Sequence, residues 1–156
     1  MAYQKLQAGE ALAVIPSDTI DIPNPAAIAN TGTAAAPTGA QLVGTGTEFT
    51  KTVAVGDIVY DTTNSVVATV DAIVSDTVLT TSAAIATGAS YVIYSQANNP
   101  SNGCVLYVGV AGDVKVKMAG GNEVLFKGAL AGTFLPINVT RVLSTGTAAT
   151  DIVALW

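Results

Sequence analysis

The sequence contains no histidine and a single cysteine, Cys104. Without histidine, the chain has no imidazole to act as a general base, to complete a catalytic triad or to bind zinc. The lone cysteine lacks the histidine partner that activates a cysteine nucleophile, and it has no second cysteine for an intrachain disulfide. Because Cys104 stands among apolar residues at the start of a predicted strand, we expect a buried, inert thiol.

Charged residues are also scarce. They make up 11% of the chain, against about 25% in typical soluble domains, whereas hydrophobic residues make up 50%. The surface must therefore consist largely of Thr, Ser, Asn, Gly and backbone. A surface this poor in charge favours association, so we expect a homo-oligomer or a larger assembly that buries apolar area between chains. The alternative is a merely hydrophobic β-domain.

The sequence has neither a clustered basic patch nor a long apolar run. The nearest approach to a basic cluster is Lys115, Lys117 and Lys127, which we expect on a solvated sheet face. Nucleic-acid binding normally requires a basic footprint that neutralises phosphates, so no nucleic-acid partner is expected. No stretch approaches the roughly 18 apolar residues of a membrane-spanning helix, and the first residues lack the apolar core of a signal peptide. No membrane partner is expected either.

The acidic residues do not form a motif. Asp57, Asp61, Asp71 and Asp76 are close in sequence, but each lies at a strand end or in a turn, where aspartate commonly bonds backbone amides. The glycine-rich stretches match neither a phosphate-binding P-loop nor a dinucleotide-binding fingerprint. We therefore predict no catalytic residue, no metal site and no cofactor, in a protein that is not an enzyme.

The chain does contain alternation of apolar and polar residues, the pattern of a half-buried strand. The run DVKVKM alternates, the triplet GGN at residues 120–122 interrupts it, and EVLFK resumes it at residues 123–127. Glycine reaches the positive φ that tight hairpin turns require. Residues 114–127 therefore predict a β-hairpin.

Two stretches of small and turn-forming residues divide the chain. Residues 26–40 predict one linker and residues 97–100 a second. Between them, residues 41–96 predict short strands rich in Val, Ile and Thr, which indicate a small barrel or sandwich. The order of these strands and the spacing of the turns resemble those of small SH3-like β-barrel modules. Because an inserted domain is entered and left at two joints, we predict that residues 1–25 and 101–156 form one discontinuous β-sandwich, with a jelly-roll-like arrangement as one option. The fold class is all-β; the alternative is two domains in series with a free N-terminal arm.

Within these domains the individual strands follow from alternation and from the turn residues between them. The residues after Phe49 also predict a short strand. The other expected strands, beside those of the hairpin, lie at residues 11–15, 58–60, 66–74, 78–81, 91–94, from 104 onward and at 152–156.

Five blocks of sequence carry a family resemblance. They are IPSDTIDIPNP near the start, then LYVGVAGDVKV, GGNEVLFKG, AGTFLPINVTRV and the closing STGTAATDIVALW, in that order. With these blocks the chain resembles a family of virion proteins from tailed bacteriophages and gene transfer agents, whose best-described members are head spike base proteins. The resemblance covers the two ends of the chain, and the central residues form an insertion that short members of the family lack.

The resemblance implies a structural virion protein on the outside of a tailed-phage capsid, as a decoration (cement) protein or as the base of a head spike. The expected partners are the major capsid protein and copies of the chain itself, with a spike or fibre protein as a further candidate. The expected location is the virion, assembled in the cytoplasm of the host bacterium. Two alternatives stay open: a tail, neck or baseplate component, and a carbohydrate-binding adhesion module with Tyr60, Tyr91 and Tyr94 as its candidate platform.

We expect the assembly interface in the C-terminal part of the chain, at Trp156, Leu155, Phe134 and Arg141. Tryptophan is enriched at interface hot spots, and a terminal strand that ends in Trp should be tied into either a core or an interface, because loose ends fray. Arg141, the only arginine, has the geometry to hold a loop through forked hydrogen bonds.

Overall fold

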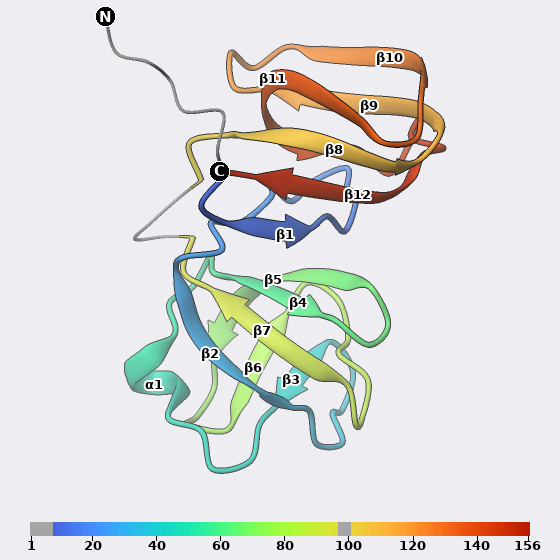
Figure 1. The fold of residues 1–156 in the computed structure, drawn as a ribbon. Coiled ribbons are helices and arrows are strands. Elements are labelled where there is room, and N and C mark those ends of the chain that lie inside the picture. The colour runs from blue at the N-terminus through green and yellow to red at the C-terminus, as the bar shows by residue number, and fades with distance from the viewer. Residues whose placement is uncertain (1–7, 97–100) are drawn as a thin grey trace, which may run out of the picture. The chain divides into compact units, whose positions relative to one another are not determined.

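The computed structural model describes residues 8–96 and 101–156, and over these residues the chain is all-β, as predicted. Its strands form two six-stranded antiparallel sheets, in keeping with the β-sandwich class (Figure 1). The chain divides into two compact units. We call Met1–Pro25 with Ser101–Trp156 the terminal unit, and Ala26–Pro100 the central unit.

The terminal unit takes its strands from both ends of the chain. They are β1 (Ala11–Ala13), β8 (Cys104–Val110), β9 (Gly112–Met118), β10 (Glu123–Ala129), β11 (Thr133–Val142) and β12 (Thr150–Leu155). Across the sheet the order is β1-β12-β8-β11-β9-β10. The first strand of the chain therefore pairs with the last, as Figure 1 shows for blue β1 beside red β12. The predicted hairpin is confirmed as β9 and β10, and Gly121 in its turn has φ +94°.

The sheet of the terminal unit curls around its own core. Strand β11 pairs with β8 over its first residues and with β9 over its last, so it passes from one half of the sheet to the other. Leu106 and Val108 of β8, Val114 and Val116 of β9 and Ile152 of β12 belong to one buried cluster. The two halves, β1-β12-β8 and β9-β10, thus cover a shared core. The six strands lie in one sheet, whereas a jelly roll has eight strands in two sheets.

The N-terminal segment stays attached after β1 ends. The backbone N–H groups of Val14, Ser17 and Ile22 donate hydrogen bonds to carbonyls of β12 and β11. Ile22 is only 2% exposed and belongs to the core cluster of the terminal unit. Residues 8–25 therefore supply an edge strand and a core side chain to a sheet whose other described strands all come from the end of the chain.

The central unit is a small, curled barrel of short strands. It contains β2 (Ile28–Thr33), β3 (Gln41–Val43), the helical turn α1 (Phe49–Thr52), β4 (Ile58–Asp61), β5 (Val66–Ile73), β6 (Val78–Thr81) and β7 (Ser90–Tyr94). The sheet order is β2-β7-β4-β5-β6-β3. One further bridge, in which the N–H of Ala35 donates to the carbonyl of Val43 at 2.7 Å, links the chain just after β2 to β3. The sheet thus curls until its two edges meet.

Apolar and aromatic residues fill this barrel. Leu42, Phe49, Leu79, Ile85 and Ile93 are completely buried in one cluster. The two buried aspartates act in turns, as expected: for example, Asp61 accepts hydrogen bonds from the backbone N–H groups of Thr63 and Asn64.

The prediction of a linker over residues 26–40 is wrong. Strand β2 lies in this stretch and pairs with β7, and Ala34 beyond it is buried. The sequence IANTGT has weak local strand character, and its conformation comes from the partner strand. Gly32 fits because the Tyr91 ring lies over it: a Cβ there would be 2.7 Å from the Tyr91 hydroxyl. The central unit begins at residue 26 and not at 41.

The short strand predicted after Phe49 is also absent, since Phe49–Thr52 form the helical turn α1. The buried Phe49 ring anchors this turn, whose first N–H donates to the carbonyl of Asp76. At the end of this turn the backbone N–H of Val53 donates a hydrogen bond to the carbonyl of Phe49. The second predicted linker, residues 97–100, lies outside the described residues.

Candidate functional site

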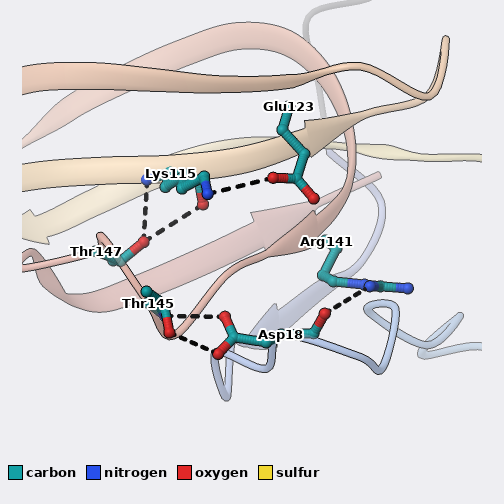
Figure 2. A network of polar contacts seen from close by, with 6 residues as sticks. All are labelled: Asp18, Lys115, Glu123, Arg141, Thr145 and Thr147. Carbon is teal, nitrogen blue, oxygen red and sulfur yellow. Dashed lines mark hydrogen bonds and ion pairs between the residues drawn. The ribbon is translucent and has the colours of Figure 1, made fainter.

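Arg141 on β11 holds the N-terminal loop of the terminal unit. Its Nε and Nη2 atoms lie 2.8 and 2.7 Å from Oδ1 of Asp21. Its Nη1 donates to the backbone carbonyl of Asp18 at 2.8 Å (Figure 2). The Arg141 side chain is only 16% exposed. The forked arrangement expected from the sequence is therefore present, and it joins the two ends of the chain.

Asp18 fastens the same loop to the turn before β12. Its carboxylate accepts the N–H of Thr145 at 2.9 Å and the Thr145 hydroxyl at 2.7 Å (Figure 2). These bonds, together with further ones from Ser144, favour the charged carboxylate and hold the pKa of Asp18 below its ordinary value of 3.8. Arg141 and Asp18 thus fix the segment that follows β1, and with it the position of β1 beside β12.

Charged side chains gather on the outer face of β9 and β10. The Lys115 ammonium lies 3.2 Å from a carboxylate oxygen of Glu123, and Thr147 both accepts from the Lys115 N–H and donates to its carbonyl (Figure 2). Strand alternation places Lys117 and Lys127 on the same side. We call Lys115, Lys117, Glu123 and Lys127 the charged outer half of the sheet.

The other half of the outer surface is apolar. Strand partners line up in two rows across β1, β12, β8 and the start of β11. One row is Ala13, Val153, Tyr107 and Phe134, and the other is Ala11, Leu155 and Val105. The row between them, Leu12, Ala154, Leu106 and Leu135, belongs to or packs against the core cluster, so the two outer rows point away from the core. We call these seven outer residues the apolar face.

The apolar face is partly open to solvent and contains no charge. Phe134 is 58% exposed, and its ring centroid lies 5.3 Å from that of Tyr107. Ala11 and Ala13 are exposed, and the other members are partly buried. The sequence carries a signal for this face, because the runs CVLYVGV in β8 and IVAL in β12 are apolar at every position and so make both strand faces apolar.

The four predicted interface residues separate into two pairs. Phe134 and Leu155 belong to the apolar face. Trp156 packs against the core cluster and donates its indole N–H to the Ser101 hydroxyl at 3.3 Å, and Arg141 is engaged by the N-terminal loop. An interface role for all four stays a prediction, and the structure adds Tyr107 as a neighbour that the sequence reasoning missed.

The single cysteine is buried. Burial raises the pKa of the Cys104 thiol to about 12, so the group stays neutral, and it donates a hydrogen bond to the carbonyl of Val139. Residues 8–96 and 101–156 contain no group of three or more carboxylate, cysteine or histidine side chains placed to hold a metal ion. In the same residues, no helix has the length and hydropathy needed to cross a membrane.

The resemblance of the five sequence blocks to head spike base proteins stays a prediction. Comparison with known proteins gives it no further support. No protein-family model, no curated protein and no solved structure matches the chain.

Proposed function

We propose that this chain is a non-enzymatic structural protein of a tailed-phage virion, placed on the capsid exterior as a decoration protein or as the base of a head spike. The observation that carries the proposal is the uncharged apolar face, which spans four strands of the terminal unit. An exposed apolar patch of a few hundred Å² is often a functional surface, and here we assign it to contacts within the particle. The resemblance of the chain ends to head spike base proteins supports the choice of particle.

The size of the face suits repeated weak contacts. Four strands about 4.8 Å apart and two rows about 7 Å apart give a patch of about 300 Å². Burying this patch against a similar one stabilises a contact by roughly 15 kcal/mol at ~25 cal/mol per Å². Association itself costs about 4–15 kcal/mol, so one contact is weak to moderate. On a symmetric shell many such contacts act together, and the assembly becomes strong through multivalency.

The structure does not favour the adhesion alternative. The three tyrosines considered as a glycan platform, Tyr60, Tyr91 and Tyr94, are 2%, 2% and 6% exposed. The rings of Tyr60 and Tyr94 meet edge to face with their centroids 5.5 Å apart, and the Tyr91 ring packs against Phe49. Tyr91 belongs to the core cluster of the central unit, and Tyr60 and Tyr94 are also buried, so none of the three rings offers a flat exposed surface on which a sugar could stack.

Cryo-electron microscopy of purified particles tests the proposal. Particles made with the intact gene should show density on the capsid exterior that is missing from particles made with the gene deleted. Mass spectrometry of the same preparations should detect the chain only in the first. Absence of the chain from purified particles would overturn the proposal. Density confined to the tail, neck or baseplate would overturn the capsid placement and support that alternative.

A further inference from the structure

We propose that the apolar face of the terminal unit is the contact surface for a second copy of this chain, packed face to face as a two-fold symmetric dimer. The inference deepens the proposed function and rests on it for the expectation that the chain assembles. In a two-fold contact the same patch serves both partners, so the patch must be compatible with itself.

The charge distribution favours a second copy as the occupant. The chain has a net charge of −5, so two copies repel each other at long range. The apolar face carries no charge, and two such faces therefore meet without opposed like charges. Charge complementarity adds specificity for a foreign partner, and this face has no charge to provide it. The charged outer half carries three lysines and one glutamate, so a like-on-like contact there would bring together two patches of net positive charge.

The edges of the sheet favour a face contact over strand pairing between copies. Edge strand β1 has only three residues. The opposite edge, β10, has a register shift between Phe126 and Ala129, carries Lys127, and holds Gly128 at φ +63°. Short strands, bulges and edge lysines are the features that block edge-to-edge addition. Strand pairing between copies is therefore disfavoured, and a contact through a face of the sheet is the alternative.

The area is compatible with a specific dimer. A standard interface covers about 800 Å² on each partner, with an apolar centre and a polar rim. A patch of about 300 Å² forms such a centre, and face-to-face sheets pack about 10 Å apart. The exposed Phe134 ring, supported by Tyr107, stands within this patch as an aromatic anchor of the kind found at interface hot spots.

Sedimentation velocity on the purified full chain, up to about 100 μM, tests the inference. We expect a reversible dimer for the wild type. Phe134→Glu should raise the dissociation constant more than about tenfold, because a charge would be buried in the contact. Val55→Glu is the matched control: Val55 is also 58% exposed, lies on the central unit, and gives the same net charge after substitution. It should leave the dissociation constant unchanged.

A second variant guards against a folding defect. Ala13→Glu changes an exposed position on β1 that the core does not use, and it should weaken the dimer as Phe134→Glu does. Each variant should keep the wild-type unfolding transition at dimer-dissociating concentrations. A wild-type monomer at all concentrations would overturn the inference. Equal weakening by Phe134→Glu and Val55→Glu would overturn it as well, because the contact would then lie elsewhere.

Particle binding separates this inference from the proposed function. Suppose that the wild type is a monomer that binds purified capsids and that Phe134→Glu abolishes this binding. The apolar face would then dock on the particle, which would overturn the dimer and leave the proposed function standing. A dimer broken by Phe134→Glu, from a chain absent from purified particles, would support the inference and overturn the proposed function.

Discussion

The substitution Ile22→Ala should destabilise a unit whose other strands come from the far end of the chain. Ile22 is 2% exposed and lies in the core cluster of the terminal unit, although it belongs to no strand. Truncating a buried isoleucine to alanine removes its packing contacts and leaves a cavity, at a cost of about 2–4 kcal/mol. Small domains have unfolding free energies of about 5–15 kcal/mol, so the loss is a large fraction of the whole.

Trp156 makes this effect measurable in one unit alone. It is the only tryptophan of the chain and packs against the core cluster of the terminal unit. Its fluorescence during urea unfolding should therefore follow that unit, whereas far-ultraviolet circular dichroism follows both. With a urea slope of about 1–3 kcal/mol per M, Ile22→Ala should lower the tryptophan midpoint by roughly 1–3 M.

Ile85→Ala is the matched control, because Ile85 is completely buried in the central unit. It should shift only the part of the dichroism signal that comes from the central unit and leave the tryptophan midpoint unchanged. A change below about 0.5 kcal/mol for Ile22→Ala would refute the claim that the N-terminal segment completes the terminal core. Equal tryptophan shifts for both variants would refute the assignment of the tryptophan signal to the terminal unit alone.

Three further predictions concern single groups. Hydrogen bonds from Thr145 lower the pKa of Asp18 in the folded state. The stabilisation that they provide is present above the unfolded pKa near 3.8 and is lost as pH falls through the lower folded pKa. Below about pH 4 the urea midpoint should therefore fall more steeply for wild type than for Asp18→Asn. Gly112→Ala should lower the free energy of unfolding by about 1–3 kcal/mol, because the new Cβ would lie 2.5 Å from a backbone nitrogen. Gly120→Ala should change it little, because the nearest atom to its Cβ would be 3.7 Å away. Equal urea midpoints for the two variants would contradict this prediction. Cys104, whose burial raises the thiol pKa to about 12, should react with a disulfide reagent only after unfolding, and rapid labelling of the folded protein would contradict its burial.

The elements that could be predicted from the sequence are those with a local cause. The β9–β10 hairpin follows from alternation and from a glycine that reaches positive φ in the turn. Strand β6 lies where predicted, at Val78–Thr81, because its residues favour strands and turn-forming residues flank it. In such segments the backbone conformation and the side-chain pattern agree without help from distant residues.

The elements that escaped prediction depend on distant partners. Strand β2 has a polar, glycine-containing sequence, and it becomes a strand because β7 provides its hydrogen bonds and Tyr91 packs over Gly32. The helical turn α1 exists because Phe49 is buried and its N–H reaches the carbonyl of Asp76. Neither partner can be identified from the sequence around these elements, since local propensity is overridden by tertiary contacts.

The apolar face also combines a feature that is local in the sequence with one that depends on distant strands. Its composition was readable, because β8 and β12 are apolar at consecutive positions. Its geometry was not, because the row Ala13, Val153, Tyr107 and Phe134 depends on three separate strand registers. Sequence reasoning therefore selected Phe134 and Leu155 but could not place Tyr107 beside Phe134.

The split construction of the terminal unit links folding to assembly. Ala11 and Ala13 come from the start of the chain, and the other members of the apolar face come from its end. The complete face therefore exists only after β1 has paired with β12, and Arg141 and Asp18 fix the loop that follows β1. An incompletely folded chain lacks one edge of the face, so the proposed contact between copies selects chains whose two ends have already joined.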